Sequence, residues 1–363
     1  MTQHKVKIFG AGSIGNHLAN ACRTAGWQVT VVDKDAAALK RMKEEIYPKR
    51  YGAWDEAIIL ALPQESPVGG YDAIFVGTPP DSHLPIATEV LRKEAPRVLQ
   101  IEKPLCSPTL EGLDEFMSET KKHPETAVIV GFNHIVAENT LKTEELIRAG
   151  LLGKIQALDC EIRSNWQNIL TAHPWLSGPE DTYLGYWKRG GGAGGEHIHA
   201  LNLWQHFAHV VGAGRVREVV ATVDYIEQGR VNYDRSIFMN LVTESGLVGR
   251  VAQDVITQPK KKFANLQFEN GSIAWYNDIS KTEDAVEVVP RKGDKQTLKI
   301  TKTRVDEFLH EIRHIEKLLN GELKISDSPI RLDRGLESML VLAAAHRSFA
   351  EKRTITVDYS IFR

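Results

Sequence analysis

The chain has 363 residues, 42% of them hydrophobic and 25% charged, with a formal net charge of −2. This length predicts two domains, and the nearly balanced charge argues against bulk attraction to nucleic acid or to an anionic membrane. Because the sequence shows neither an apolar run of ~18 residues nor an apolar signal core before the first strand, we expect a cytoplasmic protein. Cys22, Cys106 and Cys160 are widely spaced, which favours reduced thiols.

Strands and helices alternate through the first part of the chain. Short apolar strands are predicted at 6–10, 27–33, 71–81, 97–105 and 127–133. Helical spacing is found between them, at 13–26, 36–46, 82–95 and 109–123. This alternation predicts an α/β fold in which residues 1–131 form a doubly wound, parallel dinucleotide-binding sheet.

The pattern changes after Gly131. A helix is predicted at 138–153, and strands are predicted at 154–164, 216–227, 235–246, 247–257, 261–271, 272–278 and 354–359. Two closing helices are predicted at 304–321 and 331–352. Residues 132–363 should therefore form an α+β domain for substrate binding and oligomerisation, built on a large, mainly antiparallel open sheet. As an alternative, the two closing helices pack back on the first domain.

A glycine-rich motif follows the first predicted strand. The segment Gly10-Ala11-Gly12-Ser13-Ile14-Gly15 fits GxGxxG and opens a helix, so it can bring a pyrophosphate to the helix N-terminus. Asp33 closes the second strand, where a carboxylate accepts hydrogen bonds from a ribose diol and repels a 2′-phosphate. We therefore expect NAD rather than NADP, although the adjacent Lys34 weakens this preference.

A second unusual segment is Ile-Glu-Lys-Pro at 101–104. Glu102 and Lys103 stand where a buried strand ends, and Pro104 keeps Lys103 out of helical geometry. Beside an oxidised nicotinamide and partly removed from water, the charged form of Lys103 is disfavoured. It can then exchange a proton with a substrate hydroxyl while a hydride moves to the ring. The restrained backbone would fix its aim, and the Lys103–Pro104 bond could be cis.

Four ordered motifs carry a resemblance to a known family. They are GTPPDSH at 77–83, IEKP at 101–104, GFNH at 131–134 and GGGAGGEHIHALNLWQHF at 190–207. With these motifs the chain resembles the Gfo/Idh/MocA dehydrogenases over nearly its whole length. The resemblance implies a Rossmann domain followed by an open-sheet domain, NAD(P)-dependent oxidation of a sugar-like alcohol, and a homodimer or homotetramer formed through the second sheet.

The resemblance also implies site residues. Lys103 and His199 would face the substrate as catalytic groups. Cofactor contacts would come from Gly10, Gly12, Ser13, Ile14, Gly15, Asp33, Lys34, Thr78, Pro79, His83, Glu102 and Lys103. Substrate contacts would come from Asn133, Trp166, Tyr186, Glu196 and Asn202. Two positions depart from the family pattern: Gly195 replaces an aspartate of many relatives, and Asn202 replaces another.

Alternative interpretations of the same residues stay open. A metal site is one alternative, because four histidines lie close together in the sequence: His197, His199, His206 and His209. The sequence has no HExxH pattern, so we expect no metal.

The aromatic residues between 165 and 189 suit stacking on sugar rings and equally suit an oligomer interface. A retained NAD that cycles during epimerisation, elimination or glycoside cleavage, and a non-catalytic dinucleotide sensor, are the alternative functions.

Overall fold

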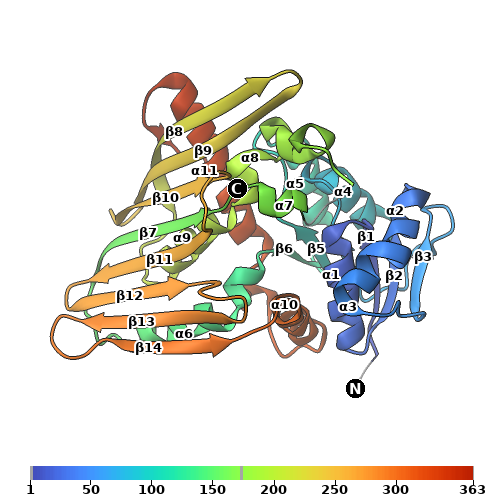
Figure 1. The fold of residues 1–363 in the computed structure, drawn as a ribbon, viewed down its shortest axis with the longest axis horizontal. Helices are drawn as coiled ribbons and strands as arrows, with labels where there is room; N and C mark the ends of the chain where they lie inside the picture. Colours follow the sequence, from blue (N-terminus) through green and yellow to red (C-terminus); the bar gives the residue numbers. More distant parts are fainter. Residues whose placement is uncertain (1–2, 172–174, 363) are drawn as a thin grey trace. The chain divides into compact units, whose positions relative to one another are not determined.

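The computed structural model describes residues 3–171 and 175–362 (Figure 1). Its contacts divide the chain into two compact units. We call the first the parallel-sheet unit; it comprises the chain up to Cys106, Glu111–Asn133 and Arg304–Leu332. The nine-strand unit comprises Ser107–Leu110, His134–Thr303 and the chain from Asp333. That each unit folds as an independent domain stays a prediction.

The parallel-sheet unit is built on six strands in the order β3-β2-β1-β4-β5-β6, with every neighbouring pair parallel. The strands are β1 (Lys5–Phe9), β2 (Gln28–Val32), β3 (Ile58–Ala61), β4 (Ala73–Val76), β5 (Val98–Glu102) and β6 (Ala127–Gly131). The order reverses between β1 and β4, as in dinucleotide-binding sheets. The predicted doubly wound fold is therefore confirmed, although the four-residue strand β3 was not predicted.

Helices connect these strands. They are α1 (Ser13–Thr24), α2 (Ala36–Arg41), α3 (Tyr47–Tyr51), α4 (His83–Lys93), α5 (Leu113–Lys122) and α10 (Arg304–Leu319). The helix predicted at 36–46 is divided, because α2 passes into a π-helical turn at Met42–Ile46 before α3. Helix α10, one of the closing helices, packs against α1 within this unit.

The core of this unit explains its apolar strands. Every residue of β4 and of β5 is buried, because helices cover both faces of a parallel sheet. Each fully buried branched side chain contributes about 1.5–3 kcal/mol relative to its exposed state. The strands therefore hold the loops at their carboxyl ends on a rigid base.

The nine-strand unit has the order β14-β13-β12-β11-β7-β10-β9-β8-β15. Its strands are β7 (Ile155–Arg163), β8 (Val216–Gln228), β9 (Val231–Thr243), β10 (Val248–Asp254), β11 (Lys261–Phe268), β12 (Gly271–Tyr276), β13 (Glu283–Pro290), β14 (Gln296–Thr301) and β15 (Ile355–Thr356). Only the β7–β10 pair is parallel among these neighbours. The mainly antiparallel sheet is confirmed, whereas β13 and β14 were not predicted.

The helices of this unit are α6 (Glu138–Arg148), α7 (Gln167–Thr171), α8 (Gly192–Glu196), α9 (His199–Val210) and α11 (Leu332–Glu351). Helix α9 packs on β7 and β10, and α6 packs on β12 and β13 (Figure 1). Trp204 in α9 is fully buried, and its indole N–H donates to the Leu158 carbonyl at 2.7 Å. Helix α9 is thereby fixed to the sheet.

Shorter 3-10 helices complete the described chain. They lie at Pro80–Ser82, Asn133–Val136, Pro179–Asp181, Tyr183–Gly185, Trp187–Arg189, Ile325–Asp327 and Ser360–Phe362. Within residues 3–171 and 175–362, no helix has the length and apolar character needed to cross a membrane.

Candidate active site

The glycine motif forms a tight turn between β1 and α1. Gly10 has φ +107°, and a Cβ there would lie 2.7 Å from the Gly77 carbonyl oxygen. A Cβ on Gly15 would overlap the Gly10 carbonyl oxygen, whereas a Cβ on Gly12 would meet no atom within 4 Å. The outer glycines therefore build the turn, and Gly12 leaves its backbone open to a ligand. This division of roles fits a pyrophosphate at the N-terminus of α1.

Asp33 lies at the end of β2, beside the glycine turn. Its carboxylate accepts the Ala11 N–H at 2.8 Å and the Asp35 N–H at 2.9 Å. Each oxygen keeps acceptor capacity for a further donor such as a ribose hydroxyl. Lys34 is exposed, as expected for a loop residue.

Arg50 is a charged neighbour of this turn that the sequence did not indicate. Its guanidinium donates to the Ser13 carbonyl at 2.9 Å and to the Ser13 hydroxyl at 2.8 Å. It comes from α3, whose position beside the motif depends on the fold. Arg50 thus adds positive charge next to the proposed pyrophosphate position.

His83 links the loops that follow β4 and β5. One ring nitrogen lies 2.7 Å from the Thr78 carbonyl oxygen, and the other lies 2.9 Å from the Pro104 carbonyl oxygen. Burial lowers the pKa of His83, and these carbonyl contacts partly offset that effect. The Lys103–Pro104 bond is cis. The ring of His83 is buried, and both of its nitrogens already contact backbone carbonyl oxygens of the two loops. A direct contact of His83 with a cofactor therefore stays a prediction.

The next strand end carries the Glu-Lys-Pro motif. Lys103 is half-buried, while Glu102 is buried and accepts a hydrogen bond from the Gln100 amide at 3.0 Å. Burial raises the pKa of Glu102 to about 7, although the nearby Lys103 charge and the Gln100 bond act in the opposite direction. Lys103 therefore emerges from the sheet directly beside a titratable carboxyl group.

His199, the second predicted catalytic group, begins α9 in the nine-strand unit. Its ring stacks on that of His134 with centroids 4.4 Å apart. Two of the four motifs, GFNH and the glycine-rich segment, therefore meet in this histidine pair. His134 was not among the predicted site residues, although the quoted GFNH motif contains it. Glu196 is half-buried three residues before His199.

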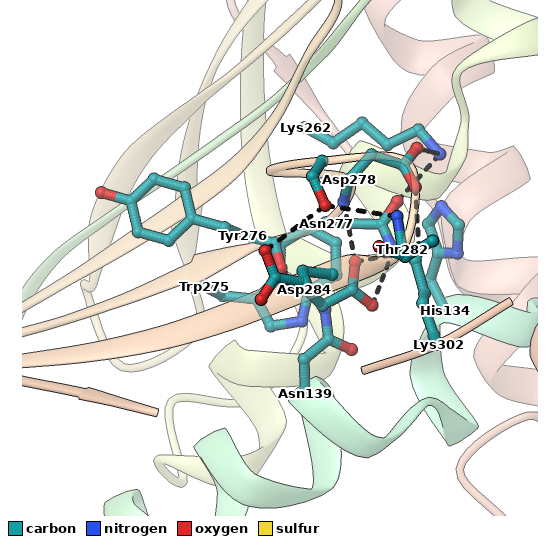
Figure 2. A network of polar contacts seen from close by, with 12 residues as sticks. His134, Asn139, Lys262, Trp275, Tyr276, Asn277, Asp278, Thr282, Asp284 and Lys302 are labelled. Atoms are coloured by element: carbon teal, nitrogen blue, oxygen red, sulfur yellow. Dashed lines mark hydrogen bonds and ion pairs between the residues drawn. The ribbon is translucent and has the colours of Figure 1, made fainter. Parts of the chain in front are cut away.

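An ionic network lies beside His134 (Figure 2). Lys302 contacts Asp278 at 2.8 Å and Asp284 at 2.9 Å, and Lys262 contacts Asp278 at 3.0 Å. Burial alone would raise the pKa of Asp278, but these lysines and Lys260 hold it well below its usual range. The network therefore gives this end of the sheet fixed positive and negative charges.

The network also explains the run of lysines at 260–262. Such a run is typical of a solvated sheet edge, but β11 lies between β12 and β7 inside the sheet. Lys260 and Lys262 instead neutralise Asp278. Their role is electrostatic rather than protection of an edge.

The remaining predicted substrate residues have different environments. Trp166 is buried and packs on Tyr233 with ring centroids 4.4 Å apart. Asn202 is buried and donates to the Ser338 hydroxyl at 3.1 Å. Tyr186 is half-buried, with its hydroxyl donating to the Glu180 carbonyl at 3.2 Å, and Asn133 is buried. Substrate contacts by these residues stay predictions.

The histidines of α9 bind separate carboxylates. His206 Nε2 lies 2.8 Å from Glu144, and His209 Nε2 lies 2.6 Å from Glu337. Within the described ranges, no group of three or more His, Cys, Asp or Glu side chains is arranged to hold a metal ion. These two histidines instead fasten α9 to α6 and α11.

Comparisons with known proteins agree with this geometry. Residues 4–132 match the Gfo/Idh/MocA family, described as an oxidoreductase family with an NAD-binding Rossmann fold. This region is therefore similar to the NAD-binding part of the Gfo/Idh/MocA oxidoreductases. The match ends just after β6 and so covers the glycine turn, Asp33 and Lys103. No curated protein matches the sequence.

Solved structures extend the similarity in fold to the whole chain. A putative myo-inositol dehydrogenase from Sinorhizobium meliloti is 20% identical with a TM-score of 0.72, covering 98% of this chain and 100% of its own. A levoglucosan dehydrogenase in complex with NADH and L-sorbose is 16% identical with a TM-score of 0.76, covering 99% and 100%. The WlbA dehydrogenase from Bordetella pertussis, in complex with NADH and UDP-GlcNAcA, is 17% identical with a TM-score of 0.72 and the same coverage.

Proposed function

We propose that this chain is an NAD-dependent dehydrogenase that moves a hydride between the nicotinamide and a secondary alcohol of a sugar, cyclitol or nucleotide-linked sugar. The observation that carries the proposal is the open backbone at Gly12, next to the ribose-binding carboxylate Asp33, at the same edge of the parallel sheet as Lys103. Carboxyl ends of parallel strands are where such sheets bind dinucleotides. Bound NAD supplies the hydride acceptor.

The chain's own groups divide the remaining work. Backbone N–H groups at the start of α1 bind the pyrophosphate, and Asp33 binds the ribose diol. Lys103 removes the hydroxyl proton as the alcohol is oxidised, and returns it in the reverse direction. His199, stacked on His134, is the proposed second catalytic group and orients a substrate hydroxyl.

The substrate class is supported by similarity in fold and by local chemistry. The structural neighbours named above were crystallised with L-sorbose or with UDP-GlcNAcA. In this chain, the His134–His199 pair and the ionic network supply polar groups suited to a polyhydroxylated ligand. We therefore propose a sugar-like alcohol, without assigning the reacting carbon.

A two-part assay tests the proposal. Calorimetry measures NAD binding, and absorbance of reduced nicotinamide then reports turnover across polyols, cyclitols and nucleotide sugars. The proposal expects NAD binding and hydride transfer with at least one compound of the panel. Tight NAD binding without transfer to any compound would contradict it and favour the sensor. Turnover without added NAD, with cofactor released on denaturation, would favour the redox-cycling alternative.

We also propose a homo-oligomer formed through the outer face of the nine-strand sheet. Val220 in β8, Phe238 in β9 and Val248 in β10 are exposed there although the residues flanking Phe238 are buried. Exposed apolar groups on neighbouring strands are typical of an interface. Light scattering should show that Phe238→Asp lowers the molar mass of the assembly, whereas Ile59→Asp, an exposed apolar change in β3, should not. Equal masses for wild type and Phe238→Asp would contradict this interface.

A cytoplasmic location stays part of the proposal. Cys22, Cys106 and Cys160 are free and buried. Burial raises the pKa of the Cys106 thiol to about 12, so it stays protonated at neutral pH. Free thiols of this kind are common in proteins of reducing compartments.

A further inference from the structure

Glu311 is a buried acid to which the proposed mechanism assigns no role. It lies in α10 with no exposed surface, and neither carboxyl oxygen accepts a well-aligned hydrogen bond. Among the described residues, no lysine or arginine forms an ion pair with it. An ionised carboxylate has only acceptors, so two buried oxygens without donors are costly. A proton on Glu311 would convert one of those oxygens into a donor.

The groups that face Glu311 do not supply a compensating positive charge. Helix α1 contributes the buried Cys22 thiol, and β5 contributes Glu102, Gln100 and, further along, Lys103. The Gln100 amide donates to Glu102 at 3.0 Å and also approaches Glu311, without the alignment of a full hydrogen bond. On α10 itself, the neighbouring His314 is bonded to Ser328. Glu102, the residue that precedes Lys103, is therefore an acidic neighbour of Glu311.

Space around Glu102 is also restricted. A Cβ on Gly131 of β6 would lie 2.6 Å from the Glu102 carboxylate, so the glycine leaves just enough room for it. The carboxyl group is thereby held inside the sheet rather than turned to solvent. Two carboxyl groups in such a site cannot both ionise cheaply.

The electrostatics agree with this geometry. Burial raises the pKa of Glu102 to about 7. Burial raises the pKa of Glu311 well above its usual value, and the charge of Glu102 raises it further, while the Gln100 amide offsets only part of this. The two groups therefore titrate as a pair rather than independently.

We propose that Glu102 and Glu311 hold one shared proton at neutral pH, so that one negative charge, rather than two, lies behind the Lys103 amine. The catalytic consequence rests on the proposed function, because Lys103 is there the acid/base. A second negative charge would favour the ammonium form of Lys103 and oppose proton removal. Glu311 is in this sense a positioning residue that acts through Glu102 on Lys103.

Infrared spectroscopy tests the shared proton without any enzyme assay. The wild type at neutral pH should show the C=O stretch of protonated carboxyl groups, and this band should be weaker in Glu311→Gln, although Asp234 still contributes to it. Glu316→Gln, the same substitution at a half-buried site on α10, is the matched control and should keep the band. A wild-type spectrum identical to that of Glu311→Gln would overturn the proposal.

Stability against pH gives a second readout. Because the folded-state pKa of Glu311 is raised, its contribution to stability is present at low pH and is lost as pH rises above the unfolded value of 4.5. The urea midpoint of Glu311→Gln should therefore rise relative to wild type between pH 5 and 9. A midpoint difference that is constant over this range would indicate packing alone and would contradict the proposal.

The pH profile of turnover tests the link to Lys103. Glu102→Gln removes the remaining negative charge, so the pH of half-maximal alcohol oxidation should fall by about one unit, a tenfold gain in kcat/KM on the acidic side. Glu316→Gln should leave the midpoint in place. An unshifted midpoint in Glu102→Gln would overturn the link. If no substrate turns over, the proposed function fails, while the infrared and stability results still decide the shared proton.

Discussion

The two units bury acidic side chains in opposite surroundings. In the parallel-sheet unit, Glu102 and Glu311 are both buried, and burial raises the pKa of both. In the nine-strand unit, Lys262 and Lys302 surround Asp278, whose pKa is held below its usual range. The acids are buried in both units, so the opposite directions of their pKa shifts come from the lysines around Asp278.

This contrast shows that neighbours, rather than burial alone, decide the charge of an interior acid. The first site favours a neutral group that can exchange a proton close to Lys103. The second favours a fixed ionic network that holds the end of a sheet.

Removing a cation from the network should have the largest effect. Lys302 is buried and contacts both Asp278 and Asp284, so Lys302→Met removes the lysine at Asp284 and leaves Asp278 to Lys260 and Lys262 alone. We expect unfolding free energy to fall by about 3–5 kcal/mol in urea denaturation at neutral pH. Lys260→Met, which removes a more exposed partner of Asp278, should cost less than about 1 kcal/mol. Equal losses in the two variants would count against the network.

Asp234 sharpens the contrast because it lies in the nine-strand unit without a cation. Its carboxylate accepts the Gly194 N–H at 2.6 Å, and burial raises its pKa to about 7. Stability from this group is present below pH 3.8 and is lost as pH rises through about 7. Asp234→Asn should therefore gain on the order of 2 kcal/mol at pH 8 and almost nothing at pH 4.

Chemical denaturation at the two pH values measures this gain. The control is Asp224→Asn, because Asp224 is only partly buried and is paired with Arg235. It should show no gain that grows with pH. A pH-independent gain in Asp234→Asn would mean that packing, rather than ionisation, is responsible.

Asp33 represents a third environment, in which backbone N–H groups hold the acid. Asp33→Ser removes the charge that repels a 2′-phosphate, so the ratio of NADP to NAD affinity should rise about tenfold, or about 1.4 kcal/mol. Calorimetry with both dinucleotides measures the ratio. Asp35→Ser keeps a capping side chain at the start of α2 and should leave the ratio unchanged. An unchanged ratio in Asp33→Ser would remove Asp33 from cofactor selection.

Much of the fold could be predicted because local patterns agree with it. Alternating strands and helices indicated the parallel sheet, and both closing helices were predicted. Strand β3 was missed because it has four residues and exposes Ile59, which hides its periodicity. Strand β14 was missed because it exposes most of its side chains, and charged residues interrupt β13. The π-helical turn in 42–46 has no sequence signal that we recognise.

The candidate site also combines residues that the sequence could place with contacts that it could not. Gly12, Asp33 and Lys103 each lie near the carboxyl end of a predicted strand, so sequence order alone placed them at one edge of the sheet. The His134–His199 stack and the approach of Glu311 to Glu102 join residues far apart in the chain. No local pattern encodes such contacts, and tertiary packing alone creates them.

The acid/base role of Lys103 is the central claim, and a single-turnover measurement tests it most directly. The rate of nicotinamide reduction with a substrate from the panel would be compared between wild type, Lys103→Met and the exposed control Lys121→Met. The account predicts a fall of at least about a hundredfold in Lys103→Met alone, with NAD affinity nearly preserved. Equal rates in wild type and Lys103→Met would contradict it.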